Sequence, residues 1–211
     1  MNHAIDTLID TYPDLKVCQA SLMQALEIMG DAYRQGGKLL LCGNGGSGAD
    51  CEHIVGELMK GFISRRPVPD KVREQFQQHF PEEADYLADH LQGALPAISL
   101  VSHSALITAF SNDVSAEMVY AQQVYGYGQP GDVLLAISTS GNSANVVRAV
   151  QVAKALGLAT IGLTGSHGGK LSQHCDVVIK APRDLTHEVQ ELHLPIYHAL
   201  CIWLENEFFT P

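Results

Sequence analysis

Short runs of consecutive apolar residues recur along the chain and alternate with longer stretches in which apolar residues are spaced three or four apart. The runs are typical of strands buried on both faces, and the spaced stretches are typical of amphipathic helices. Because the two patterns alternate, the sequence predicts an α/β fold with three layers, in which a five-stranded parallel sheet is flanked by helices. The predicted strands are 38–42, 94–101, 133–137, 159–164 and 176–179.

The first 37 residues are predicted to be helical. A short amphipathic pattern covers residues 4–10 and stops near Pro13. A longer helix, capped by Asp14, is expected to end at Gly36 and Gly37. Its apolar positions suit packing either against the core or against a helix of another subunit.

The composition changes between residues 64 and 93. This segment opens with R-R-P-V-P-D and carries two charged helical patterns, 71–79 and 82–91, which are separated near Pro81. We expect two short surface helices here. We interpret 64–93 as an insertion in a single domain that spans 1–211, and it would serve either as a lid or as an interface element.

A turn rich in hydroxyl groups follows the predicted strand at 133–137 and precedes a helical pattern. Hydroxyl donors, unpaired main-chain N–H groups and the positive end of a helix dipole together favour a bound phosphate. The turn has no Lys, so a monophosphate suits it better than the triphosphate of a P-loop. The alternative is that Ser143 only caps the helix, but the turn offers more hydroxyls than a cap uses. They belong to Ser138, Thr139, Ser140 and Ser143.

A second turn, G-N-G-G-S-G at 43–48, follows the predicted strand at 38–42. It matches the G-x-G-x-x-G pattern of dinucleotide sites. Such a site also needs an acidic residue about 20 positions later, where this chain reads I-S-R-R-P-V-P. We therefore interpret the turn as part of the same phosphate pocket, because both turns follow strands and meet at one sheet edge. The expected contacts come from Asn44, Gly45, Gly46 and Ser47.

Two predicted helices carry side chains suited to acid–base chemistry. His53 and Glu57 are four apart and therefore share a helix face. The last helix, which begins near Thr186, carries Gln190 and His198, which lie about 80° apart around a helix. Each of these pairs by itself is also typical of a surface ion pair or of a buried histidine, and the spacing does not establish a metal.

The segments I-S-T-S-G-N-S and C-G-N-G-G-S resemble those of the sugar isomerase (SIS) fold and, within it, of the phosphoheptose isomerases. The resemblance implies a flavodoxin-like sheet with a long N-terminal helix. It also implies a homo-oligomer, expected to be a tetramer, with subunit contacts through the helices of 1–37. The expected substrate is sedoheptulose 7-phosphate, which is converted to a manno-heptose 7-phosphate.

The same resemblance assigns roles to residues. Glu57 and His198 become the acid–base pair of an enediol mechanism. Zinc, where it is bound, would be held by His53, Glu57, Gln190 and His198. Further substrate contacts are expected from Asn112, Asp113 and Gln190. Two positions depart from the family pattern, His187 in place of an Asp and Gly61 in place of an Arg, and they bear on the identity of the sugar.

The bulk composition narrows the class of protein. The chain of 211 residues is 46% hydrophobic and carries a formal net charge of −10 without a basic block, which argues against nucleic-acid and anionic-membrane partners. Five cysteines without a C-x-x-C pair favour reduced thiols. The N-terminus does not resemble a signal peptide, and no apolar run approaches the ~20 residues of a membrane span. These features predict a soluble cytoplasmic protein.

A non-catalytic protein of the same fold is the main alternative. One relative with this fold is an adaptor that binds a bacterial replication initiator, and it lacks the Glu of the His-x-x-x-Glu element. This chain has both Glu57 and His198, so the sequence favours an enzyme.

Overall fold

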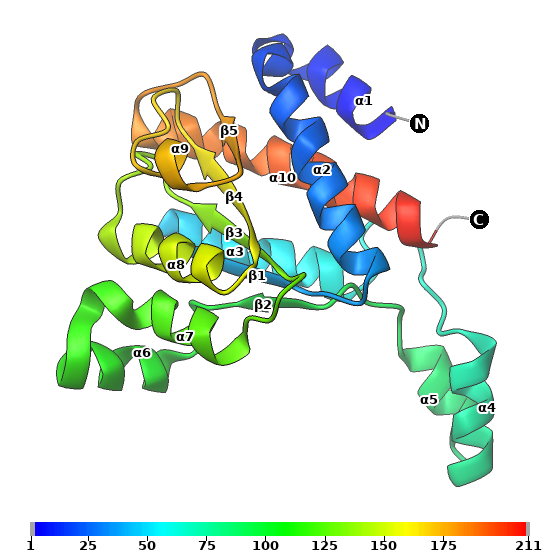
Figure 1. The fold of residues 1–211 in the computed structure, drawn as a ribbon. Helices are drawn as coiled ribbons and strands as arrows, with labels where there is room; N and C mark the ends of the chain where they lie inside the picture. Colours follow the sequence, from blue (N-terminus) through cyan, green and yellow to red (C-terminus); the bar gives the residue numbers. More distant parts are fainter. Residues whose placement is uncertain (1–2, 210–211) are drawn as a thin grey trace.

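A computed structural model describes residues 3–209, which fold around one parallel sheet with the strand order β2-β1-β3-β4-β5 (Figure 1). Every residue of β1 and β3 is buried, as their unbroken apolar runs predict. The predicted five-stranded α/β fold is therefore confirmed. The strands are β1 (Leu39–Gly43), β2 (Ala97–Ser99), β3 (Val133–Ile137), β4 (Ala159–Thr164) and β5 (Val177–Lys180).

Helices cover both faces of the sheet. Alternate strand residues face opposite sides, so Leu39 and Leu41 enter one apolar cluster, while Leu40 and Cys42 enter the other. The first cluster is covered by α1 (His3–Thr11), α2 (Gln19–Arg34), α3 (Gly46–Met59) and α10 (Thr186–Phe209). The second is covered by α6 (Ser104–Phe110), α7 (Val119–Tyr127), α8 (Ala144–Ala155) and α9 (Leu171–His174).

The N-terminal helical region differs from the prediction at its start. Pro13 occupies the first turn of a 3-10 helix (Pro13–Cys18), which leads into α2, and Asp14 makes no capping bond. Asp14 instead pairs with Arg183, with 2.6 Å between Oδ2 and Nη2. The predicted end is correct, because α2 stops before Gly36, whose φ of 80° suits the residue after a helix.

The strand predicted at 94–101 is shorter in the structure. Only Ala97–Ser99 pairs with β1, at the edge of the sheet. Pro96 has no N–H to donate, although its carbonyl oxygen still accepts a bond from Leu39 N at 2.9 Å. The apolar run therefore extends beyond the part that can pair as a strand.

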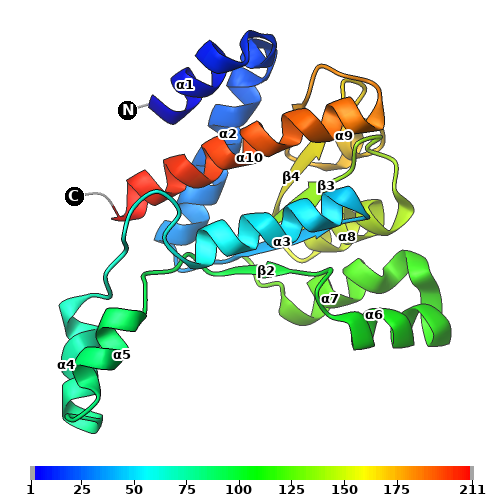
Figure 2. The same cartoon turned by 180° about the vertical axis from the view of Figure 1, so that it is seen from behind.

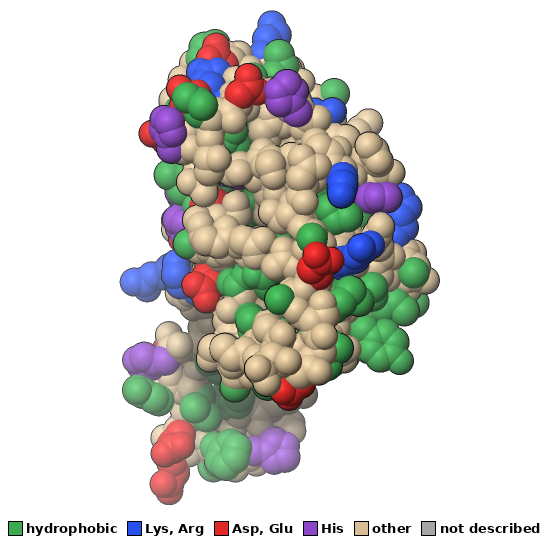
Figure 3. All heavy atoms as spheres, turned by 90° about the vertical axis from the view of Figure 1, so that its left-hand side faces the viewer, with side chains coloured by type: hydrophobic (Ala, Val, Ile, Leu, Met, Phe, Trp, Pro, Cys, Tyr) green, Lys and Arg blue, Asp and Glu red, His purple; other side chains and the backbone are tan. Residues whose placement is uncertain are grey.

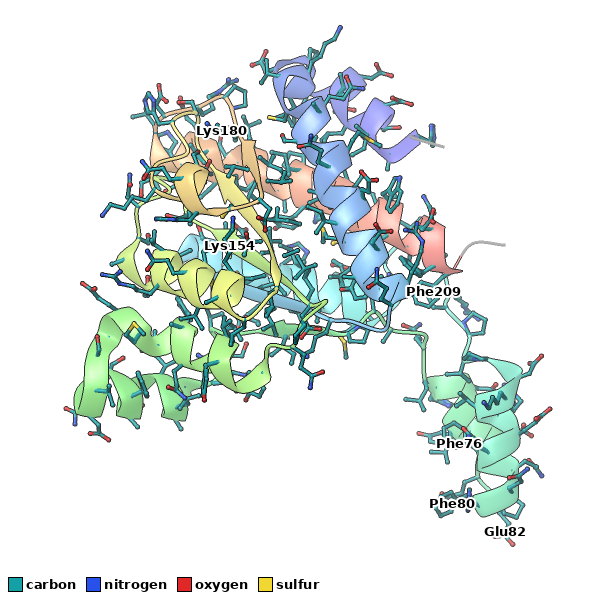
Figure 4. The ribbon with its side chains drawn as sticks, viewed as in Figure 1. Phe76, Phe80, Glu82, Lys154, Lys180 and Phe209 are labelled. Atoms are coloured by element: carbon teal, nitrogen blue, oxygen red, sulfur yellow. The ribbon has the colours of Figure 1, made fainter. Side chains whose placement is uncertain are left out.

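The segment 64–93 forms two helices, as predicted, and they project away from the sheet as an arm (Figure 1). They are α4 (Asp70–His79) and α5 (Ala84–His90). α4 has no buried residue. Figure 4 shows Phe76, Phe80 and Glu82 on this arm, far from the layers that enclose the core.

The carboxyl ends of the strands open on one side of the molecule. Gly43 at the end of β1 pairs in register with Ile137 at the end of β3, so the two predicted phosphate turns begin side by side. α3 and α10 run in the same direction across one face (Figure 2). Within residues 3–209, no helix is long and apolar enough to cross a membrane.

Candidate active site

Two asparagine side chains join the turns that follow β1 and β3. Asn44 Nδ2 donates to Asn145 Oδ1 at 2.8 Å, and Asn145 Nδ2 donates to Asn44 Oδ1 at 2.9 Å. The Tyr120 hydroxyl supports the first turn by donating to the Gly43 carbonyl oxygen at 2.7 Å. The structure therefore brings both turns into one site, and Asn145 is a member of it that the sequence reasoning missed.

The hydroxyl turn at 138–143 keeps its donors available. Ser143 makes no capping bond to α8, and its Oγ lies 3.1 Å from Ser138 Oγ instead. The main-chain N–H groups of Ser140, Ser143 and Ala144 make no hydrogen bond within the described part of the chain. Free N–H and O–H donors at a helix N-terminus favour an anion. Ser143 occupies the N-cap position of α8, but its side chain makes no capping bond, so the structure gives the capping alternative no support.

Glycines shape both turns. Gly141 has a φ of 66°, and a Cβ there would lie 2.1 Å from the Gly168 carbonyl oxygen, so only glycine fits. Gly45, which precedes α3, has a φ of 55°. A Cβ on Gly46 would lie 2.4 Å from Gln190 Nε2, because the Gln190 amide of α10 packs directly on the start of α3.

Glu57 and His53 meet on one face of α3, where Glu57 is buried and His53 is exposed. His53 Nε2 lies 3.1 Å from Glu57 Oε1, and Lys60 Nζ lies 3.2 Å from Glu57 Oε2. The Glu57 side chain is 12% exposed and the His53 side chain 42% exposed, so Glu57 is largely enclosed while His53 is open to solvent. The other nitrogen of His53, Nδ1, lies 2.9 Å from the hydroxyl of Tyr197 on α10.

His198 completes the group from α10. Its ring centroid lies 5.0 Å from that of His53 and 5.3 Å from that of Phe62. His198 Nε2 is buried and has no hydrogen-bond partner within residues 3–209. Burial, followed by the neighbouring His53, lowers the pKa of His198 despite the opposing charge of Glu57. The site thus combines a carboxyl group with an imidazole that favours its neutral form.

His193, a further histidine of α10, lies in the core and not in the site. It is fully buried, and its Nε2 lies 3.2 Å from the Thr164 carbonyl oxygen. Burial lowers the pKa of His193 to about 4.

The residues implied as zinc ligands form only part of a metal site. Their donor types suit zinc, and His53 and Glu57 are in contact. Across residues 3–209, however, no group of three His, Cys, Asp or Glu side chains is arranged to hold a metal ion. Zinc therefore stays a prediction.

Asn112 and Asp113 lie in a short π-helical segment, Ser111–Ser115, between α6 and α7. Both are exposed, and Asn112 Nδ2 donates to Asp113 Oδ1 at 2.8 Å. Their side chains bond to each other, and the structure does not join them to the two turns. Their contact with substrate stays a prediction.

The structure explains why position 61 is a glycine, which the sequence reasoning did not. A Cβ at this position would lie 2.3 Å from the Ser64 carbonyl oxygen, so the turn after α3 excludes an Arg there. Lys60, one position earlier, places a cation against Glu57. His187, the other position that departs from the family pattern, is exposed in the first turn of α10.

The face onto which the strand ends open is dominated at its centre by main-chain and uncharged polar atoms, with Lys, Arg and His toward its rim (Figure 3). This agrees with a phosphate site made of hydroxyl and N–H donors. Lys154 and Lys180 lie over the α8 and β5 side of the molecule (Figure 4).

A parallel sheet with a hydroxyl turn after β3 and a glycine turn after β1 defines a protein of the SIS class, and the SIS domain profile matches residues 14–90 and 76–165. The chain belongs to the phosphoheptose isomerase family of this class and is an isomerase of sugar phosphates.

Three relatives illustrate the similarity. The chain is 35% identical to a phosphoheptose isomerase of Rhodospirillum rubrum over 95% of this chain and 93% of the relative. It is 41% identical to the phosphoheptose isomerase of Crocosphaera subtropica over 92% of this chain and 86% of the relative. A solved phosphoheptose isomerase of Neisseria gonorrhoeae is 31% identical, covers 97% of this chain and 95% of its own, and superposes with a TM-score of 0.74.

Proposed function

We propose that this enzyme converts sedoheptulose 7-phosphate to D-glycero-D-manno-heptose 7-phosphate, with Glu57 and His198 as its acid–base pair. The names of the relatives support the substrate. The observation that carries the proposal is the placement of Glu57 and His198 on two neighbouring helices, α3 and α10, with an open phosphate-type turn at the end where α3 begins.

The distance between the phosphate turn and Glu57 suits a long sugar phosphate. Ser47 and Glu57 are ten residues apart on α3, so their Cα atoms lie about 15 Å apart along the axis. Helical side chains lean toward the N-terminus, so Glu57 leans back toward the phosphate turn. A sugar phosphate held by its phosphate at the turn can therefore present its other end to Glu57.

The proposed chemistry is a proton transfer in two parts. Glu57 removes the proton from C1 of the ketose and later returns it to C2, while His198 moves the proton between the two oxygens. The product is the aldose, with no proton gained or lost overall, and the proton held by Glu57 can exchange with solvent before it reaches C2. The phosphate contributes positioning, because it fixes C1 and C2 relative to Glu57.

Replacing Glu57 by Gln tests this assignment. The amide keeps nearly the same shape but cannot accept the proton, so turnover should fall by about 10²–10⁴-fold. In deuterated water the wild type should incorporate deuterium into sedoheptulose 7-phosphate and its product, and Glu57→Gln should not. A wild type that exchanges no label with this or another ketose phosphate would leave the non-catalytic adaptor as the better reading.

We further propose that zinc binds at His53, Glu57, Gln190 and His198. The 3.1 Å contact between His53 Nε2 and Glu57 Oε1, together with the neighbouring ring of His198, supports this proposal. When bound, zinc would polarise the substrate carbonyl. Protein purified without chelator should contain zinc by elemental analysis, and His53→Ala should contain much less. Equal zinc in both proteins would disprove the site.

A further inference from the structure

A pocket of about 310 Å³ lies between α8 and α9, which are side by side on one face of the sheet (Figure 1). Three basic side chains line it: Arg148 on α8, Lys170 just before α9 and His174 at the end of α9. Within residues 3–209, its lining includes no acidic side chain. The chain has 23 Asp and Glu residues against 13 Lys and Arg, so this pocket has the opposite character to the molecule as a whole.

The positive charge of the pocket is not neutralised by the protein. Arg148 and Lys170 make no ion pair in the part of the chain that the structure describes. Arg148 Nη1 donates instead to the uncharged Gln151 side chain, with 3.0 Å to Oε1. Lys154, further along α8, differs from them because Asp176 Oδ1 lies 2.9 Å from its Nζ. Arg148 and Lys170 are therefore free to pair with an anion from solution.

The walls of the pocket are fixed by contacts on their far sides. Val147 of the pocket lining is 5% exposed, and Leu171 at the start of α9 is fully buried in the same apolar cluster. Lys154 Nζ donates to the His174 carbonyl oxygen at 3.0 Å and so ties the end of α9 to α8. A pocket that is already formed loses less conformational freedom when it binds a ligand.

The pocket adjoins the hydroxyl turn but faces a different side of α8 from the substrate site. Lys170 N donates to Asn142 Oδ1 of the turn at 3.1 Å. Ala144 and Arg148 both line the pocket, one helical turn apart. Asn145, which joins the turn to Asn44 in the substrate site, follows Ala144 and therefore lies about 100° around the helix from it.

We propose that this pocket is a second anion site, which binds a phosphate ester of a small polyhydroxylated molecule. Arg148 and Lys170 supply charge-assisted hydrogen bonds to phosphate oxygens. The side-chain amides of Gln151 and Gln173, which also line the pocket, suit hydroxyl groups because they both donate and accept. The volume is within the range of small-molecule sites and exceeds what inorganic phosphate alone would fill.

The inference goes beyond the proposed function, because the pocket contains neither Glu57 nor His198 and none of the implied zinc ligands. A sugar phosphate bound there leaves the acid–base pair free for the substrate. The enzyme would thus hold two phosphate esters on one chain, one at the hydroxyl turn and one between α8 and α9.

The double variant Arg148→Gln, Lys170→Gln tests the site by removing both cations and keeping polar side chains. In isothermal titration calorimetry with glucose 6-phosphate, the wild type should bind one more ligand per chain than this variant. Each lost hydrogen bond to the phosphate should weaken binding in the pocket at least about 10-fold.

The double variant Lys16→Gln, Lys71→Gln is the matched control. It changes the net charge by the same amount at two exposed lysines, one in the 3-10 helix after α1 and one in α4. It should bind as many ligands as the wild type. Both double variants should keep the wild-type melting temperature, because they replace exposed side chains without ion pairs. Equal binding by the wild type and Arg148→Gln, Lys170→Gln, or an equal loss in the control, would overturn the inference.

Two further ligands identify the part of the molecule that the pocket recognises. Glucose should not bind there, because it lacks the phosphate. Inorganic phosphate should bind more weakly than glucose 6-phosphate, because it leaves the amides of Gln151 and Gln173 unused. Inorganic phosphate that binds as tightly as glucose 6-phosphate would overturn the assignment to a polyhydroxylated ester.

A third variant separates the pocket from the substrate site. Ser140→Ala, Ser143→Ala should keep the binding event that Arg148→Gln, Lys170→Gln loses, and its disappearance in the serine variant would overturn the inference. A wild type that keeps this event but exchanges no deuterium with any ketose phosphate would contradict the proposed function alone.

Discussion

The hydroxyl turn shows how a protein with a net charge of −10 can attract a phosphate. The attraction is local, since the N–H groups of Ser140, Ser143 and Ala144 are open at the start of α8. Ser143 Oγ lies 3.1 Å from Ser138 Oγ and makes no capping bond to its own helix. The main-chain N–H groups at the start of α8 are therefore available to an anion.

Removing two of these hydroxyls should weaken substrate binding. Each hydrogen bond lost to a charged group costs roughly 1.5–3 kcal/mol. The double variant Ser140→Ala, Ser143→Ala should therefore raise the dissociation constant for a sugar phosphate at least about 10-fold per hydroxyl, since 1.4 kcal/mol is tenfold. Isothermal titration calorimetry measures this change.

A matched control removes two hydroxyls elsewhere, in Ser21→Ala, Ser104→Ala. Ser21 donates to the Cys18 carbonyl oxygen at 2.9 Å, and Ser104 is exposed at the start of α6. This control should bind like the wild type. Equal affinity in both double variants would show that the phosphate does not bind at the turn.

Arg66, which is 1% exposed, joins α3 and α10 beyond Glu57 and His198. Its guanidinium donates to the carbonyl oxygens of Glu57 at 3.0 Å and Leu58 at 2.7 Å, which lie in the last turn of α3. Arg66 Nε also donates to Glu205 Oε1 of α10 at 2.8 Å. These bonds satisfy carbonyls that a helix end leaves without partners.

Glu205 binds the start of the arm to the same point. Its carboxylate accepts the N–H groups of Phe62 and Ile63, both at 2.8 Å. Burial raises the pKa of Glu205, but these donors and Arg66 outweigh burial and hold the pKa below its usual range. One buried ion pair thus joins α3, α10 and the root of the arm.

The sequence predicted four of the five strands closely, because β1, β3, β4 and β5 are apolar runs bounded by turn residues. It overestimated β2, since an apolar run shows burial but not how far an edge strand pairs. It also missed α6, whose seven residues include no fully buried position and so carry a weak periodic signal. Local patterns predicted the elements well and their ends less well.

The site was predictable where it depends on local chemistry and not where it depends on distant pairs. Asn44, Ser47 and the hydroxyl turn follow strands of a parallel sheet, so their meeting at one edge could be inferred. Arg66 and Glu205 are 139 residues apart, and no local pattern links them.

The molecule leaves a groove open beside His198. The groove lies between α1 and α10, has a volume of about 430 Å³, and includes His198 in its lining. Tyr12, which is 41% exposed, and Ile63, which is 68% exposed, also line the groove. Exposed apolar side chains around a groove are typical of an interface. We propose that another copy of this chain covers the groove in a homotetramer.

The oligomeric state tests this proposal. Light scattering after size exclusion should give four times the 22.8 kDa mass of the chain. Ile63→Asp places a charge in the groove and should shift the protein to smaller species, because burying an unpaired charge is costly. Val114→Asp is the matched control, since Val114 is 66% exposed in the segment between α6 and α7, away from the groove. It should keep the wild-type mass. A wild type that elutes as a monomer, or an Ile63→Asp variant that keeps the mass of four chains, would show that this groove is not a subunit interface.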